Sequence, residues 1–333
     1  MFHDNAEFHN IEELLPLADG AFAMTRYPEA IRQTLVPNGV NFSLHPSGAE
    51  IRFNVRGGEP VVRLRCEMPN SSDAELFWGS FCHGKVPVTE QWTEVKITPP
   101  GNMAMLQRWT ALQDLPVDPH VARVMLPYGP GIHYGGIEGD IEPPRPEQLP
   151  RRTLLMYGSS ITQGGCANRT VCTYATRTAH LLGVDLLNLG LGGAAMCEPQ
   201  VADYLAARTD WDLAVLELGI NMGDFATEEF RKRVEYFIPT IALAHPAAMI
   251  FCLDIYPFYG DFDPALTKHH EFRRIVRQTA TNLRLGNVVH LEARPMLRDL
   301  RGLTTDLIHP SPAGMDEIAQ NLVRAMRDRA CGL

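Results

Sequence analysis

The chain has 333 residues, of which 45% are hydrophobic and 21% charged, so it is long enough for about two domains and has the composition of a folded globular protein. These values exclude a collagen, a coiled coil and wholesale disorder, and no apolar run reaches the roughly 20 residues that span a bilayer. The net charge of −9 is uneven: residues 1–150 carry 11 basic and 19 acidic residues, against 19 and 20 in residues 151–333. With no basic half, the chain is a poor candidate for binding nucleic acid or an anionic membrane.

The cysteines and the first residues predict the compartment. There are seven cysteines, which is an odd number, and they are scattered without a CxxC pair, so neither a zinc site nor a disulfide framework is indicated. The first ten residues are polar and acidic, unlike a secretory signal. We therefore expect reduced thiols in a cytoplasmic protein that uses no metal and no cofactor. The expected partner is a small molecule, and the sequence leaves homo-oligomerisation open.

Up to residue 126 the chain shows short stretches in which apolar and polar residues alternate. Period two is typical of half-buried strands, and turn-forming residues such as Gly57-Gly58 separate these stretches. The stretches are Asn41–His45, Glu50–Arg56, Val61–Cys66 and Thr93–Thr98. Several such strands in succession predict an antiparallel β-sandwich.

Residues 127–150 contain six prolines and five glycines. A stretch of this composition is expected to be neither regular helix nor central strand, because proline lacks a backbone donor and glycine weakens both. We interpret it as the connection between an N-terminal β-sandwich domain, residues 1–140, and a second domain, residues 151–333.

After the connection, apolar runs alternate with amphipathic stretches. The predicted strands are Leu154–Tyr157, Leu186–Leu189, Leu213–Leu218, Met249–Ile255 and Val288–Leu291. The predicted helices are Tyr174–Leu182, Glu228–Ala244, Leu266–Leu283 and Pro312–Arg329. Strand–helix alternation indicates βαβ units, and hence an α/β domain whose parallel sheet is covered on both faces.

Polar groups follow four of these strands. Gly158–Gly165 follows the first strand, Gly190–Gly193 the second and Gly219–Asn221 the third; Asp306–Pro310 comes one connection after the fifth. Ligands of an open parallel sheet bind outside the carboxyl ends of its strands, so these residues are expected at one edge. A hydroxyl, a glycine turn, an amide and an Asp/His pair are the parts that acyl transfer requires.

Each part also has a structural interpretation. Ser159 or Ser160 would serve as the N-cap of the helix that follows, and the glycines would simply form a tight turn. Asp306 would shape the start of the helix that opens at Ser311-Pro312. The joint occurrence of all parts at successive strand ends favours catalysis.

The blocks resemble those of the SGNH/GDSL hydrolases over residues 151–330. The matching positions are Gly158, Ser160 and Thr162 in the first block, Asn188, Gly190 and Gly193 in the second, Gly219 and Asn221 in the third, and Asp306 and His309 in the last. The resemblance implies a flavodoxin-like three-layer α/β/α domain with a five-stranded parallel sheet. The wording around Ser160 resembles a two-domain subgroup with an N-terminal jelly-roll-like domain, which includes sugar esterases and a polyketide-tailoring acyltransferase.

The resemblance also implies roles for single residues. Ser160 would be the nucleophile, His309 the general base and Asp306 the residue that orients it. The oxyanion hole would consist of the Ser160 and Gly193 backbone N–H groups and the Asn221 amide. The family's usual Gly-Asp-Ser has Ser159 in place of its aspartate here, so any help from that carboxylate is missing.

The chemistry agrees with these roles. A serine hydroxyl needs a nearby base, and imidazole suits neutral pH because its unperturbed pKa is about 6.5. We therefore predict a serine esterase of small acyl esters, such as short acyl groups on a carbohydrate or polyol, with acetylesterase activity as one form. The alternative is an acyltransferase that uses the same triad and passes the acyl group to an alcohol.

A more distant alternative is nucleotide binding. The run from Gly190 through Gly192 to Ala195 fits a G-x-G-x-x-A fingerprint after a strand. The carboxylate that ends the next strand, Glu217, lies 27 residues after Gly190 instead of about 20. A metal site at His269-His270 is also weak, because neighbours on a helix diverge and no third ligand is suitably spaced.

Overall fold

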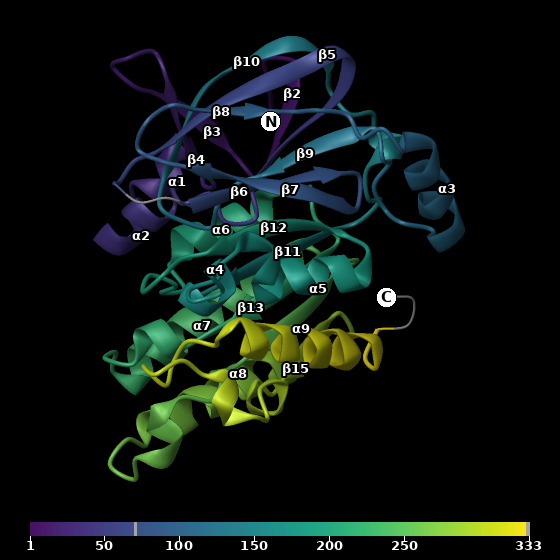
Figure 1. Ribbon diagram of the computed structural model, residues 1–333. Helices are drawn as coiled ribbons and strands as arrows, with labels where there is room; N and C mark the ends of the chain where they lie inside the picture. The colour runs from purple at the N-terminus through teal and green to yellow at the C-terminus, as the bar shows by residue number, and fades with distance from the viewer. Residues whose placement is uncertain (70–71, 331–333) are drawn as a thin grey trace. The chain divides into compact units, whose positions relative to one another are not determined.

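The computed structural model describes residues 1–69 and 72–330, which fold as two units (Figure 1). The first unit comprises Met1–Glu29, Asn41–Arg151 and Gly183–Leu187. The second comprises Ala30–Val40, Arg152–Leu182 and the described chain from Asn188. Each unit therefore includes a short segment from the part of the sequence that was predicted to form the other.

The first unit is β-rich and antiparallel, as expected. Its strands are β1 (Phe2–His3), β2 (Ala6–His9), β3 (Glu13–Pro16), β4 (Phe22–Thr25), β5 (Glu50–Cys66), β6 (Ser72–Trp78), β7 (Phe81–Val88), β8 (Thr93–Lys96), β9 (Val121–Met125) and β10 (Ile132–Glu142). They form one hydrogen-bonded network in the order β3-β4-β10-β5-β9-β6-β7, and β2 and β8 also pair with β5. The helices of this part of the sequence are α1 (Glu29–Arg32), α2 (Pro37–Phe42) and α3 (Met103–Gln113).

Two strand predictions in this part are wrong. Glu50–Arg56 and Val61–Cys66 are a single 17-residue strand, β5, because Gly57-Gly58 does not reverse the chain. Gly58 has a φ of +69°, and the pairing with β10 is irregular beside it, so the glycines bend the strand. The predicted strand Asn41–His45 is instead the end of α2 and a turn, since Pro37 opens a helix there.

The Pro/Gly-rich stretch also differs from its prediction. Its residues 132–142 form the 11-residue strand β10, which lies between β4 and β5 within the sheet. All six prolines fall outside this strand, at 127–130 and 143–150, so none removes a hydrogen bond from it. Gly136 and Gly139, with φ of +113° and +133°, lie at irregularities in its register with β5. Glycine here permits bulges and does not end the strand.

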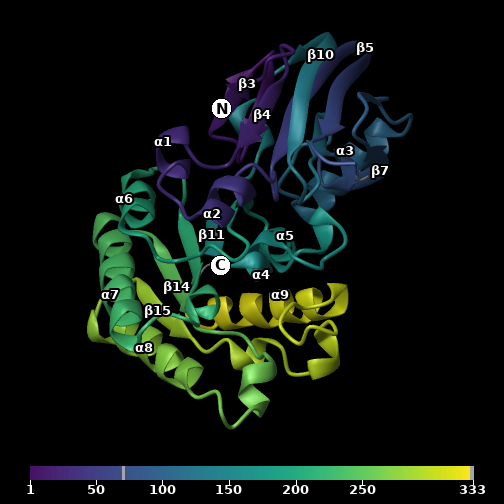
Figure 2. The same cartoon turned by 90° about the vertical axis from the view of Figure 1, so that its left-hand side faces the viewer.

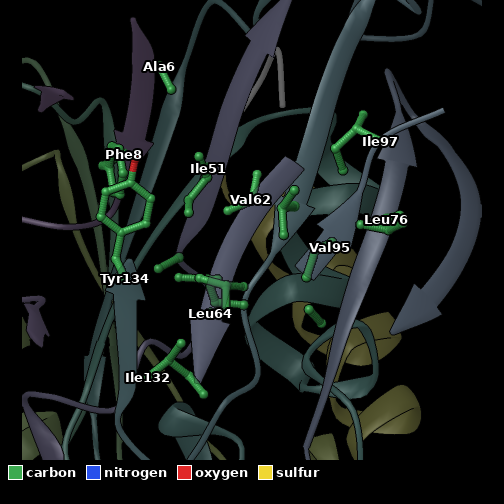
Figure 3. Packing of buried hydrophobic residues seen from close by; sticks show 14 of the residues in the cluster. Ala6, Phe8, Ile51, Val62, Leu64, Leu76, Val95, Ile97, Ile132 and Tyr134 are labelled. Carbon is green, nitrogen blue, oxygen red and sulfur yellow. The ribbon is translucent and has the colours of Figure 1, made fainter. Parts of the chain in front are cut away.

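The core of the first unit is formed by the inward faces of these strands (Figure 3). Fully buried side chains from β2, β5 and β10, including Phe8, Ile51 and Tyr134, pack together there. The Phe8 and Tyr134 rings meet edge to face at 4.9 Å. Burying each such side chain stabilises the fold by roughly 1.5–3 kcal/mol.

The second unit contains the predicted five-stranded parallel sheet. Its strands are β11 (Thr153–Gly158), β12 (Asp185–Gly190), β13 (Leu213–Glu217), β14 (Met249–Leu253) and β15 (Val288–Leu291), in the order β12-β11-β13-β14-β15. All five predicted strands are confirmed, and the order is that of the flavodoxin-like fold. The first strand in the sequence, β11, thus lies inside the sheet between β12 and β13. The three loops that follow these strands, which carry the serines, the glycine turn and Asn221, are therefore neighbours.

Helices cover both faces of this sheet, with α6, α7 and α8 on one and α5 and α9 on the other (Figure 2). They are α4 (Ser160–Gln163), α5 (Tyr174–Leu182), α6 (Pro199–Ala207), α7 (Thr227–Ala244), α8 (Lys268–Asn282) and α9 (Pro312–Arg327). The four predicted helices are confirmed as α5, α7, α8 and α9, whereas α6 was missed. Among the described residues, no helix is both long and apolar enough to cross a membrane.

Candidate active site

The two adjacent serines after β11 have different roles in the structure. Ser159 is the N-cap of α4: its backbone is extended, and its Oγ accepts a hydrogen bond from the Ile161 N–H at 3.2 Å. Ser160 is the first residue of α4, and its Oγ lies 2.7 Å from Nε2 of His309. The capping interpretation therefore applies to Ser159, and Ser160 is the residue that meets the histidine.

The histidine is held by the loop before α9. Its Nδ1 lies 2.7 Å from Oδ2 of Asp306, while Oδ1 of Asp306 accepts from the His309 and Ile308 N–H groups at 2.9 and 2.8 Å. The Thr304 hydroxyl donates to the same oxygen at 2.9 Å. Burial alone would raise the pKa of Asp306, but the hydrogen bonds from these groups outweigh it and hold the pKa well below its usual range. An ionised carboxylate is thus fixed against Nδ1, which leaves Nε2 free for Ser160.

The second block joins the end of β12 to the nucleophile turn. Asn188 Nδ2 donates to the Thr162 carbonyl at 2.9 Å, and Asn188 Oδ1 accepts from the Gly190 N–H at 2.9 Å. A Cβ on Gly190 would lie 2.7 Å from Gln163 Cα and 2.8 Å from the Thr162 carbonyl carbon. Only glycine permits this approach, so the glycine turn and α4 are packed backbone to backbone.

Gly193 and Asn221 lie on the two neighbouring strand-end loops. Gly193 has a φ of +60°, and Asn221 is in a single 3₁₀ turn, Ile220–Met222, after β13. Asn221 Oδ1 accepts from the Ala195 N–H at 3.1 Å, which orients the amide so that its NH₂ group points away from that donor. Within the described chain, neither Gly193 nor Asn221 is hydrogen-bonded to Ser160, His309 or Asp306.

A buried carboxylate beside the nucleophile was not predicted. Glu217 ends β13 and is 1% exposed, and its Oε2 accepts from the Ser159 N–H and Oγ–H, each at 2.7 Å, and from the Thr162 hydroxyl at 3.1 Å. Burial raises the pKa of Glu217, against the lowering effect of these hydrogen bonds. The sequence carries a signal for it, an acidic residue that ends an otherwise apolar strand, but that pattern does not indicate contact with the nucleophile turn.

A residue from the first part of the sequence also lies at this edge. Asn38 is in α2 but belongs to the second unit, and a Cβ built on Gly193 would lie 3.3 Å from its Nδ2. The helix α2 lies close to the loop after β12, since a Cβ built on Gly39 would be 3.4 Å from the Cβ of Ala194. Glycine at position 39 therefore permits this approach. No sequence signal singled out Asn38, because the segment was predicted as part of the β-sandwich domain.

The described residues contain two groups that bring three metal-ligand atoms within 4.8 Å of one another. They are Cys166 with Asp306 and His309, and Asp261 with His269 and His270. In the first group the carboxylate and imidazole are already bonded to each other. In the second, Asp261 accepts from the Arg273 guanidinium at 2.8 Å, so a cation would meet a fixed positive charge. Neither donor set fits a resident metal ion.

The nucleotide alternative does not fit the structure. A dinucleotide fingerprint needs a helix that opens directly after the glycines, so that its N-terminus faces the pyrophosphate. Here the next helix, α6, begins only at Pro199, and Gly190 packs against α4. The glycines instead serve the contact with the nucleophile turn.

Residues 151–327, more than half of the chain, match the GDSL-like lipase/acylhydrolase family. The chain therefore belongs to that family. A search of curated proteins found no match.

Solved structures resemble nearly the whole chain at low identity. A salicylyl-acyltransferase from a tetracycline biosynthetic pathway has a TM-score of 0.81 and 19% identity, covering 97% of this chain and 94% of that one. A family two carbohydrate esterase from Cellvibrio japonicus has a TM-score of 0.65 and 15% identity, covering 98% and 96%. Another, from Clostridium thermocellum in complex with cellohexaose, has 0.59 and 16%, covering 85% and 93%. At these identities the likeness establishes the two-part architecture.

Proposed function

We propose that this protein is a serine esterase that hydrolyses short acyl esters of a carbohydrate or similar polyol through an acyl-enzyme. The observation that carries the proposal is the chain of two 2.7 Å contacts from Ser160 Oγ through His309 to Asp306. A nucleophile, a base and a group that orients the base are thereby in hydrogen-bond reach of one another, at the carboxyl edge of a parallel sheet.

In the proposed mechanism, Ser160 Oγ attacks the ester carbonyl carbon as its proton passes to His309 Nε2. Asp306 stabilises the imidazolium through Nδ1–H. The tetrahedral intermediate collapses when the leaving alcohol oxygen takes that proton from Nε2. Water then attacks the acyl-enzyme with the same histidine as base, which releases the acid and returns the proton to Ser160.

The oxyanion needs donors that are already in place. We assign them to the Ser160 N–H at the start of α4, the Gly193 N–H and the Asn221 NH₂ group, which lie at three neighbouring strand ends. None of these donors has a hydrogen-bond acceptor among the described residues, so all three are available to substrate. The Ala195–Asn221 hydrogen bond supports the assignment because it fixes which end of the amide is the donor.

The substrate class is supported by charge and by likeness. Residues 151–333 have a net charge of −1, which suits an uncharged ester better than a polyanion. Two of the similar structures are carbohydrate esterases, and the likeness extends over nearly the whole length of each esterase chain. We further propose a cytoplasmic location, for which the free thiols of all six described cysteines are the support.

A specific observation favours acyl transfer as a second candidate. The salicylyl-acyltransferase has a TM-score of 0.81, against 0.65 and 0.59 for the two esterases. The same Ser160 acyl-enzyme would then be resolved by an alcohol, with water excluded from the site.

Two measurements test these proposals. The first is p-nitrophenyl acetate turnover by wild type and Ser160→Ala. The control is Ser80→Ala in the first unit, because the Ser80 hydroxyl has no hydrogen-bond partner among the described residues. Equal rates for wild type and Ser160→Ala would reject the mechanism. The second is a product analysis by mass spectrometry with an acylated sugar as donor and added alcohols as acceptors. Free acid as the main product supports the esterase, and a transferred ester supports the acyltransferase.

A further inference from the structure

The turn that carries Ser160 depends on a carboxylate from another strand. The helix α4 has four residues, too few to hold its own geometry, since isolated short helices are unstable. A single oxygen, Glu217 Oε2, is bonded to residues on both sides of Ser160, namely Ser159 and Thr162. The carboxylate thus links the residue before Ser160 to the residue two positions after it.

The residues around this carboxylate are closely packed. A Cβ on Gly158 would lie 2.5 Å from Glu217 Oε2 and 2.8 Å from its Cβ. On the far side, the Thr162 hydroxyl lies 2.6 Å from the Tyr174 hydroxyl. Glu217 Oε1 has no hydrogen-bond partner among the described residues. The hydrogen bonds that the Glu217 side chain accepts therefore all come from the turn that carries Ser160.

We propose that Glu217 is a positioning residue for Ser160 and replaces, from the neighbouring strand, the aspartate that precedes the serine in the usual Gly-Asp-Ser motif. The position after Gly158 is occupied here by Ser159, whose N–H and Oγ–H both donate to Glu217. The sequence lacks the carboxylate in its usual place, and the fold supplies one through β13. This inference rests on the proposed role of Ser160.

The test moves the carboxylate back. Ser159→Asp alone places two carboxylates together, and Glu217→Leu alone removes the oxygen that accepts from Ser159 and Thr162 while nearly keeping the side-chain volume. We expect each to lower kcat on p-nitrophenyl acetate, with KM little changed, by about 10- to 10²-fold, the cost of a nucleophile displaced by about 1 Å. The double variant restores a carboxylate beside the turn and is expected within about tenfold of wild type.

Rates are normalised to active sites titrated to completion with a fluorophosphonate, so that unfolded protein does not count. Glu198→Leu is the matched control, because Glu198 is also a buried glutamate and neither of its carboxylate oxygens has a hydrogen-bond partner among the described residues. Its kcat should equal that of wild type. The proposal is overturned if the fold-loss of kcat in the double variant equals the product of the two single losses. It is also overturned if kcat of both single variants equals that of wild type. Activity in Ser160→Ala would reject the proposed function instead.

A second inference follows independently from Asn38. Its side chain is exposed, and its amide, which has no hydrogen-bond partner among the described residues, lies beside Gly193. A Cβ built on Gly193 would have no other atom of the described residues within 4 Å besides Asn38 Nδ2, apart from atoms of its own chain neighbours. We propose that Asn38 hydrogen-bonds the bound ester next to the oxyanion and is a specificity-determining residue, again on the premise that Ser160 is the nucleophile.

The test compares Asn38→Ala and Asn38→Asp with wild type on glucose pentaacetate and on p-nitrophenyl acetate. We expect kcat/KM for the sugar ester to fall about tenfold, which is the worth of one hydrogen bond to substrate. Asn41→Ala, an exposed asparagine of the same helix, is the control and should leave it unchanged. Wild-type kcat/KM for glucose pentaacetate in both Asn38 variants, or an equal loss on the two esters, would overturn the proposal. A rate that survives Ser160→Ala would reject the proposed function instead.

Discussion

The substitution Asp306→Asn separates the role of charge from that of shape in the proposed triad. In the structure, three donors converge on Oδ1 of Asp306: two backbone N–H groups and the Thr304 hydroxyl. An asparagine would therefore keep its amide oxygen at that position and turn its NH₂ group toward His309 Nδ1. The reverse orientation would set NH₂ against the two backbone N–H donors and would lose both of their hydrogen bonds.

An NH₂ group facing Nδ1 requires Nδ1 to be an acceptor, which places the ring proton on Nε2. The imidazole would then present N–H to Ser160 and could no longer take its proton. The same change of tautomer in a serine protease lowers kcat about 10⁴-fold, or about 5.4 kcal/mol, and we expect a similar loss here.

The assay is active-site-normalised turnover of p-nitrophenyl acetate across pH, with thermal unfolding measured alongside. The melting temperature should change little, because the contacts of the amide oxygen are kept. A loss below tenfold in a folded variant would refute the assignment of Asp306 as the group that sets the histidine tautomer.

Three further predictions concern other parts of the chain. Asn221→Asp keeps the acceptor for the Ala195 N–H but removes the proposed oxyanion donor, so kcat should fall about 10²–10³-fold with KM little changed; a loss under fivefold would contradict the role. Gly190→Ala should destabilise the fold by about 3 kcal/mol in urea unfolding, because its Cβ meets backbone atoms of α4, whereas Gly286→Ala, in open space, should be neutral; equal stabilities would show that the contact can relax. Burial, with a smaller contribution from the nearby Arg26, lowers the pKa of His45 to about 4. As pH falls from about 6.5 to 4, the unfolded chain therefore binds a proton at His45 before the folded chain does, and roughly 3 kcal/mol of folding free energy that is present above pH 6.5 is lost. In His45→Gln the free energy of unfolding should depend less on pH in this range. An unchanged pH dependence would exclude His45 as the cause of the loss.

Several features were determined by the sequence alone because their causes are local. Alternating and apolar runs predict strands from their own period, so all five strands of the parallel sheet and four of its helices were found. The rule that strand carboxyl ends share an edge then brought Ser160, Asp306 and His309 together as candidates, although the Ser160–His309 contact joins residues 149 positions apart. The strand β10 is not predicted because the composition of residues 127–150 counts prolines and glycines together. It does not take into account that the prolines lie on either side of the strand.

Tertiary structure decided what depends on exact backbone placement. The family resemblance singles out Ser160 from two adjacent serines, and the capping geometry at α4 gives the physical reason. Glu217 reaches the turn across 58 residues because β13 lies beside β11. Asn38 joins the site because a short segment from the first half of the sequence packs in the second unit. A hydrogen bond requires its atoms within about 3 Å, and a one-dimensional pattern that locates strands to within a residue or two does not have that precision.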